Sequence, residues 1–271
     1  MQKNAKNSKN QLKPIYKPYL RGNVVSRIAA KRGWRVFGYI LMFTFLCFIV
    51  GNMLPGNSRV LRVGLNAILV AASCALMMAE GSRQGEADVA FAEIAQNRLD
   101  SGKPVPDSEK DTCFHPLKGF FTAAVGVAVI FLLALVFSLI AHRQSYQLSA
   151  LPGWVSAYTN QAEISGGLAY YEEHAAMTLE DILRMVMRIL MFPYVNMVDS
   201  SDHHALYIVD KLMPILCLIV PAFYGVGYLR GPHLRALVHG NIRANRRRYN
   251  RKQRKAREQR ASRAEQKKEL V

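Results

Sequence analysis

The sequence lacks the short motifs that identify common catalytic sites. It contains no glycine-rich phosphate-binding loop, no Gly-x-Ser-x-Gly, no His-Glu-x-x-His and no Cys-x-x-Cys. It also lacks an internal repeat relating its first half to its second, which is a feature of many secondary transporters. The sequence therefore favours a protein that is not an enzyme, and we expect no cofactor.

Cysteine is also scarce, with four residues in a chain of 271. Cys47, Cys74 and Cys217 lie in apolar runs, and Cys113 lies in a polar segment. No two of them have the spacing of a metal site. We expect buried thiols rather than a framework of disulfides.

Acidic residues are missing from the N-terminal end and rare at the C-terminal end. Residues 1–35 contain ten Lys/Arg and no Asp or Glu, and residues 230–271 contain fifteen Lys/Arg and three Glu. The two ends together carry more positive charge than the whole chain, whose net charge is +17, so the middle is net acidic. Basic flanks around apolar runs are typical of a polytopic membrane protein with its basic ends in the cytoplasm.

Four apolar runs are long enough to cross a bilayer as helices: Trp34–Leu54, Val60–Ala79, Leu117–Ala141 and Ala205–Leu229. The first has 21 residues, which rise about 31 Å in a helix and match a hydrocarbon core of about 30 Å. This run is too long for the core of a signal peptide and has no cleavage site after it, so we interpret it as an uncleaved anchor.

Residues 178–197 form a fifth, amphipathic segment. Thr178 and Asp181 resemble a capping box, and apolar residues follow at helical spacing. Arg184 and Arg188 near the middle of a membrane span would cost about 2.5–3.5 kcal/mol each. A fifth crossing would also place the basic tail outside the cell. We therefore expect an interfacial helix, with its guanidinium groups among the lipid phosphates.

The sequence thus predicts an all-α fold with four transmembrane helices and one interfacial amphipathic helix. We expect a basic cytoplasmic end at 1–33, three membrane helices in 34–141 with an acidic cytoplasmic loop at 80–116, and an outer segment at 142–204. A fourth membrane helix at 205–229 and a polybasic cytoplasmic tail at 230–271 follow.

The first half of the acidic loop has an amphipathic pattern. Its apolar residues fall on one stripe of a helix, which we expect to be the buried face: Ala87, Phe91, Ile94, Ala95 and Leu99. Acidic residues lie off this stripe: Glu86, Asp88, Glu93 and Asp100. We expect a short separate helix here.

Small residues recur every four positions in the second span, at Ala67, Ala71 and Ala75, and the third span offers Gly119 and Ala123. Small residues at this spacing let helix backbones approach closely inside a membrane. We expect the second and third spans to pack along them. The alternative is that the stripe forms the face of a homo-oligomer.

Polar residues inside the spans are candidate functional residues. Asn66, Asp210 and Lys211 are the most deeply placed. Structural anchoring is the favoured role, with Asp210 and Lys211 paired to Arg62 or to lipid headgroups. The alternative is a transport path lined by Asn66 and Asp210, with helix kinks at Pro214 and Pro221.

Asp202, His203 and His204 are candidate metal ligands just before the fourth span. Their spacing matches no known catalytic signature, and adjacent histidines on a helix point about 100° apart. A solvated cluster is the favoured interpretation, and a metal site is the alternative. Glu172, Glu173 and His174 carry the same ligand types earlier in the outer segment.

The basic tail is the main candidate binding surface. Its clustered residues are Arg246, Arg247, Arg248, Arg251, Lys252, Arg254 and Lys255. Each basic residue near an anionic leaflet is worth about 1 kcal/mol, so we expect the tail to bind anionic phospholipid. A protein partner at the tail or at the acidic loop is a second possibility. Nucleic acid or a ribosome is less favoured, because Tyr249 is the tail's only aromatic residue.

These patterns favour a non-enzymatic accessory or scaffold subunit of a membrane assembly. A transporter subunit for a small solute or ion is the first alternative, and a metal-dependent membrane enzyme is the second. Segment 142–204 has neither a cysteine nor an Asn-x-Ser/Thr sequon, so we expect the cell membrane of a bacterium, the inner one, with both chain ends in the cytoplasm.

Overall fold

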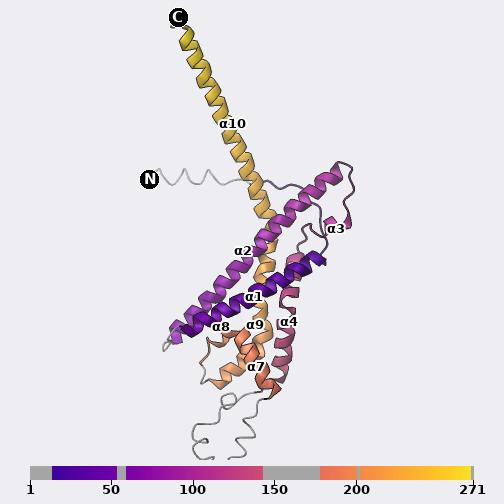
Figure 1. The fold of residues 1–271 in the computed structure, drawn as a ribbon, viewed down its shortest axis with the longest axis vertical. Helices are drawn as coiled ribbons and strands as arrows, with labels where there is room; N and C mark the ends of the chain where they lie inside the picture. The colour runs from indigo at the N-terminus through magenta and orange to yellow at the C-terminus, as the bar shows by residue number, and fades with distance from the viewer. Residues whose placement is uncertain (1–13, 54–58, 143–177, 200–201, 270–271) are drawn as a thin grey trace, which may run out of the picture.

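The computed structural model describes residues 14–53, 59–142, 178–199 and 202–269, with the side chains of the last helix described as far as Ala256. The described residues form helices and connecting segments without a strand (Figure 1). The helices are α1 (Arg27–Met53), α2 (Arg59–Asp100), α3 (Asp107–Lys110), α4 (Lys118–Ile140), α7 (Leu179–Leu190), α8 (Phe192–Val195), α9 (His203–Leu229) and α10 (Gly231–Glu269).

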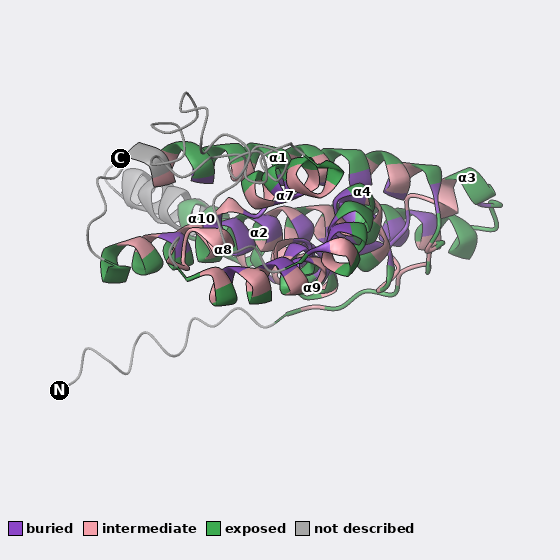
Figure 2. Cartoon of the chain, turned by 90° about the horizontal axis from the view of Figure 1, so that it is seen from below, coloured by how far each residue is buried: buried purple, intermediate pink, exposed green. Residues whose placement is uncertain are grey.

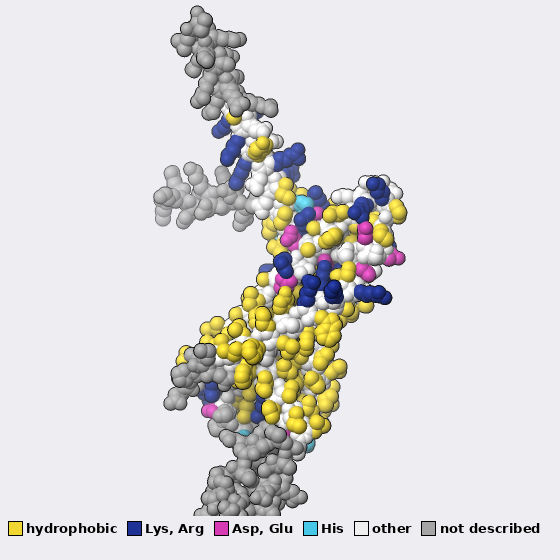
Figure 3. Space-filling model, in the orientation of Figure 1, with side chains coloured by type: hydrophobic (Ala, Val, Ile, Leu, Met, Phe, Trp, Pro, Cys, Tyr) yellow, Lys and Arg dark blue, Asp and Glu magenta, His cyan; other side chains and the backbone are white. Residues whose placement is uncertain are grey.

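Four of these helices, α1, α2, α4 and α9, are long and apolar enough to cross a membrane. Large apolar side chains cover their outward faces, and Phe45, Leu132 and Ile215 are each more than 60% exposed. Figure 3 shows hydrophobic side chains over this part of the molecule. Exposure on this scale suggests a membrane location, because lipid and not water suits such a surface. The predicted class, an all-α protein with four candidate membrane helices, is confirmed.

The bundle has two ends. We call one the basic end; it contains the start of α1, the start of α4 and the end of α9. We call the other the hairpin end, because residues 178–199, with α7 and α8, insert there. Figure 2 shows that buried residues follow the sides of the helices that face one another.

Helix α9 is the centre of the packing and lies against both α2 and α4, while α1 packs mainly on α4. Close approach of α2 and α9 depends on glycine. A Cβ atom at Gly81 or Gly85 would overlap the backbone of Tyr224 or Tyr228. The interface therefore has no room for a larger residue at these two positions.

The alanine stripe of α2 does not take part in this packing. Ala67, Ala71 and Ala75 are all exposed in the single chain. Gly119 and Ala123 are buried as expected, but Gly119 faces Tyr228 of α9. The expected packing of the second span on the third along this stripe is thus not the arrangement found, and α9 lies in that place.

Helix α2 does not stop at the end of its apolar run. It continues without a break for 42 residues, about 63 Å. No proline interrupts residues 79–100, and the helix ends at Asp100, two residues before Gly102, whose φ of +74° is the left-handed conformation common after helix C-termini. The expected separate acidic helix is therefore the second half of α2.

The buried face of this second half matches the predicted stripe only at Ala95. Phe91, Ile94 and Leu99 are exposed, whereas Val89, Ala92 and Ala95 are buried. The buried face contains two carboxylates that bind cations from other helices, as described below. Because those cations come from distant parts of the chain, the apolar stripe alone gave the wrong face.

Helix α7 begins with the predicted capping box between Thr178 and Asp181. It then runs into the bundle: Glu180 contacts His142 at the end of α4, and the carbonyl of Leu190 accepts a hydrogen bond from Thr44 Oγ1 at 3.3 Å. Thr44 lies nine residues before the end of α1, or about 13 Å along the helix axis. A helix with these contacts does not lie flat across the bundle end, and the expected interfacial placement is not confirmed.

The arginine side chains of α7 do not point to a surface as expected. Arg184 is buried, while Leu179, Ile182 and Ile189 are exposed. Arg184 pairs with Glu180 and lies over the ring of Phe137. Each guanidinium group pairs with a carboxylate inside the protein, Arg184 with Glu180 and Arg188 with Asp210, which offsets part of the cost of placing these charges in a membrane.

Candidate functional site

The junction of α2 and α10 is the candidate functional site. The first ten residues of α10 are mostly buried or half-buried, and the carbonyl of Ala236 accepts a hydrogen bond from the backbone N–H of Ile15 at 3.0 Å. Glu93 of α2 binds two residues of α10: Arg235 Nε lies 3.1 Å from its carboxylate, and His239 Nε2 lies 2.8 Å from it. These contacts fix the direction in which α10 leaves the bundle.

A buried carboxylate one turn earlier on α2 holds the basic end together. Asp88 is fully buried and accepts two hydrogen bonds from Arg32 of α1, at 2.7 and 2.9 Å. Lys118 of α4 donates to it at 3.0 Å, and the hydroxyl of Tyr228 of α9 donates at 2.6 Å. We call these four residues the Asp88 cluster. The cluster joins all four long apolar helices at one point.

The segment before α4 covers this cluster. Lys118 Nζ also donates to the carbonyl oxygens of Asp111 and Cys113, at 2.8 and 3.1 Å. Phe114 stacks on Tyr228 with ring centroids 5.1 Å apart. Burial raises the pKa of the Cys113 thiol, which therefore stays protonated and unreactive near neutral pH. These contacts hold the segment before α4 against the Asp88 cluster.

Beyond residue 240, α10 leaves the bundle and stands apart from it (Figure 1). All seven predicted tail residues, from Arg246 to Lys255, are exposed. Figure 3 shows Lys and Arg side chains along this helix, away from the hydrophobic surface of the bundle. Tyr249, its aromatic residue, is 61% exposed, and its hydroxyl accepts a hydrogen bond from Gln253.

The polar residues predicted inside the spans are engaged within the protein. Asn66 is fully buried, and its amide nitrogen donates to the carbonyl of Arg62 at 2.8 Å. Lys211 Nζ donates to the carbonyl of Ser138 at 2.6 Å. These contacts are local or join neighbouring helices, and they do not bring Asn66 and Lys211 together.

Asp210 is buried and pairs with Arg188 of α7 at 2.8 Å. The expected pairing with Arg62 is therefore replaced, since Arg62 lies 3.9 Å from Asp199 instead. The sequence argument had placed Arg188 outside the bundle and so left Asp210 without this partner.

The candidate metal ligands do not form a group. Asp202 caps α9 by accepting a hydrogen bond from the backbone N–H of Ala205 at 3.0 Å. His204 is exposed, and within the described part of the chain no three His, Cys, Asp or Glu side chains could hold a metal ion together. Glu172, Glu173 and His174 lie outside the described residues.

The residues that organise the basic end were not predicted from the sequence. Asp88 and Glu93 were placed off the apolar stripe, Arg32 was counted with the basic N-terminal end, and Lys118 was included in the third span without a role. A signal was present, because Arg32 and Lys118 both lie at the edge of an apolar span. Their shared carboxylate partner, Asp88, lies 30 residues from Lys118 and 56 residues from Arg32. Comparison with known proteins adds no further constraint: no family model matches the chain, and no curated protein or solved structure matches it.

Proposed function

We propose that the chain is a non-enzymatic accessory or scaffold subunit of a membrane assembly, which holds α10 in a fixed direction on the cytoplasmic side and presents its basic residues to an acidic partner. One observation carries this proposal. The start of α10 is fastened to α2 by Glu93, while the following residues, which include eight Lys/Arg between Arg243 and Lys255, stand exposed.

The direction of α10 favours a partner over the protein's own leaflet. From Asn241 to Lys255 the helix rises about 21 Å. Charge interactions in physiological salt are screened over about 8 Å, so basic residues held away from the bundle gain little from a leaflet at its end. Arginine predominates among these residues and can bind carboxylates or phosphates with two hydrogen bonds at once.

The transport and enzyme alternatives have less support. A transport path lined by Asn66 and Asp210 would need both side chains to face shared water, but Asn66 bonds to its own helix and Asp210 to Arg188. The metal-dependent enzyme would need a third ligand beside Asp202 and either His203 or His204, and the described residues supply none.

The proposal can be tested by purifying the full chain from its native membranes in a mild detergent. A variant with Arg246, Arg247, Arg248 and Arg251 changed to Gln should lose its co-purifying protein at least tenfold. The matched control changes Lys3, Lys6, Lys9 and Lys13 to Gln, which removes the same charge from the other basic end. This control should retain the partner.

Two results would contradict the proposal. One is a monodisperse monomer that retains no other protein. The other is equal loss of the partner in both variants, because that result would trace retention to net charge and not to α10. Binding of the full chain to vesicles with and without phosphatidylglycerol is measured in parallel. If α10 binds only where phosphatidylglycerol is present, its basic residues bind the lipid leaflet and not a protein partner.

A further inference from the structure

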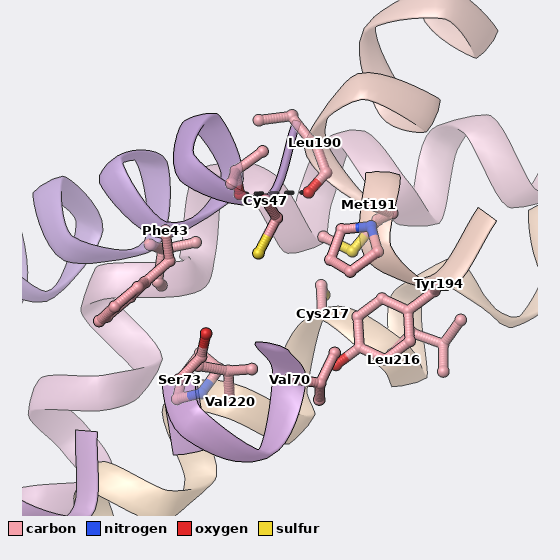
Figure 4. A pocket seen from close by; sticks show the side chains of 14 residues that line it. Phe43, Cys47, Val70, Ser73, Leu190, Met191, Tyr194, Leu216, Cys217 and Val220 are labelled. Atoms are coloured by element: carbon pink, nitrogen blue, oxygen red, sulfur yellow. Dashed lines mark hydrogen bonds between the residues drawn. The ribbon is translucent and has the colours of Figure 1, made fainter. Parts of the chain in front are cut away.

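A pocket lies inside the bundle, toward the hairpin end, where α1, α2 and α9 meet the turn between α7 and α8. The cavity itself has a volume of about 50 Å³, and the space free of protein atoms reaches about 450 Å³ when the open side of the pocket is included. Its lining includes Phe43, Cys47, Val70, Tyr194, Cys217 and Pro221. Figure 4 shows Cys47, Tyr194 and Cys217 reaching toward the same space from three different elements.

The lining is mainly apolar, and most of its polar groups are already bonded. Ser73 Oγ donates to the carbonyl of Leu69 at 2.9 Å, and Thr44 Oγ1 donates to the carbonyl of Leu190. The Cys217 thiol donates to the carbonyl of Pro214 at 3.1 Å. These groups have no proton left to offer a ligand.

The hydroxyl of Tyr194 is different. Its oxygen is buried and has no hydrogen-bond partner among the described residues. An unmade hydrogen bond in an apolar interior costs about 1–3 kcal/mol. The pocket thus contains a hydrogen-bond donor that has no acceptor among the described residues.

The depth of the pocket limits which molecules can accept a hydrogen bond from the Tyr194 hydroxyl. Thr44 lies nine residues from the end of α1, and Cys217 lies fourteen residues from the start of α9, or about 13 and 21 Å along the helices. These distances place the pocket near the middle of a hydrocarbon layer of about 30 Å. Phospholipid oxygens stay at the layer's surface, so an acyl chain that entered the pocket would bring no acceptor.

We infer that this pocket binds a neutral molecule that dissolves in the membrane interior and carries a ketone, quinone or hydroxyl oxygen, which accepts a hydrogen bond from Tyr194. The apolar lining holds the end of the ligand that carries this oxygen, and the rest of the ligand extends through the open side of the pocket. The side chains of Cys47, Val70 and Cys217 contact the ligand from three helices. This site is independent of α10 and of the function proposed above.

Benzophenone is a suitable probe, because its ketone oxygen can accept the hydrogen bond and its excited carbonyl bonds to nearby C–H groups under near-ultraviolet light. The full chain in nanodiscs would be irradiated with limiting probe and digested for mass spectrometry. Labelling should concentrate on residues 40–47, 190–194 and 216–221. Tyr194→Phe should lower it about fivefold to tenfold, in line with one lost hydrogen bond.

Tyr207→Phe is the matched control, because Tyr207 is a half-buried tyrosine of α9 that does not line the pocket. Its labelling should stay at the wild-type level. Decylubiquinone, which carries carbonyl oxygens, should compete with the probe, and hexadecane at the same concentration should not.

Three results would overturn the inference. The first is labelling spread evenly over lipid-facing residues such as Phe45 and Leu132. The second is a Tyr194→Phe variant that is folded and labelled like the wild type. The third is competition by hexadecane equal to that by decylubiquinone, which would mean a cavity without recognition of the oxygen. If Tyr194→Phe does not fold, the mapping and competition results on the wild-type chain still decide.

Discussion

The two ends of the bundle bury charge in different ways. At the basic end, one carboxylate, that of Asp88, receives donors from three other helices. At the hairpin end, charges form separate pairs, Arg184 with Glu180 and Arg188 with Asp210. Arg184 also retains two buried nitrogens without a partner among the described residues. The shared centre joins four helices at once, whereas the Arg188–Asp210 pair joins two and the Arg184–Glu180 pair lies within α7, so the basic end should be the more rigid.

The strongest test of this difference is to remove the shared centre. Asp88→Asn keeps the size of the side chain but leaves Arg32 and Lys118 without a buried counter-charge. Arginine cannot lose its proton, so we expect a loss of about 3–5 kcal/mol in the free energy of unfolding. Thermal unfolding in detergent, followed by loss of the monodisperse peak, measures the effect.

Asp107→Asn is the control for this variant, because Asp107 forms an exposed pair with Lys110 on the same side of the bundle. Its unfolding midpoint should match that of the wild type. A midpoint for Asp88→Asn that falls no further than this control would show that the Asp88 cluster does not hold the helices together.

A smaller effect is expected from breaking one pair at the hairpin end. Arg188→Met removes two hydrogen bonds from one buried carboxylate, that of Asp210, and breaks a contact between two helices only, so the loss should be about 1–3 kcal/mol. The double variant Arg188→Met with Asp210→Leu should recover part of the loss, since it leaves no uncompensated charge. Thermal unfolding checks both, and a double variant no more stable than the single one would contradict the pairing.

The smallest effect is the acid response of the pair that begins α7. Burial alone would raise the pKa of Glu180, but hydrogen bonds from the backbone and ring of His142, with the charge of Arg184, outweigh it and lower the pKa. A lowered pKa in the folded state contributes stability above the unfolded value of about 4.3, and this is lost as the pH falls through the folded pKa. Midpoints between pH 6 and 3 should therefore fall less for Glu180→Gln than for the wild type. An equal fall of the unfolding midpoint in both proteins would show that Glu180 does not contribute to the acid response.

Features set by residues close together in the sequence could be predicted, and features set by contacts between distant residues could not. The four spans follow from length and hydropathy, and the cap at Thr178 follows from residues three apart. Which face of a helix points inward does not follow in the same way. Within a span, lipid is as apolar as leucine, so an apolar face can point outward. In the second half of α2, the carboxylates of Asp88 and Glu93 turn inward to bind cations of other helices, and Phe91 and Ile94 face outward. The alanine stripe of α2 did not predict the packing found, because small residues allow close contact between helices but do not determine which helix makes it.

The candidate site was predictable only in part. The charge of the tail is a property of composition, so its exposed residues could be found from the sequence. The partners of Asp88 and Glu93 come from other helices, 30 to 146 residues away, and no local pattern indicates them. The same holds for Arg188 and Asp210, which meet only because the hairpin enters the bundle.

The unbroken length of α2 has a mechanical consequence. One half of this rod lies among the apolar helices, and the other half carries the base of α10, so the two move as a single lever. From Ala236 to Ala256 the arm of α10 is about 30 Å long, and a tilt of about 10° at its base displaces the tip by about 5 Å. A small rearrangement within the lipid layer would thus be amplified into a larger swing of the arginine-rich arm.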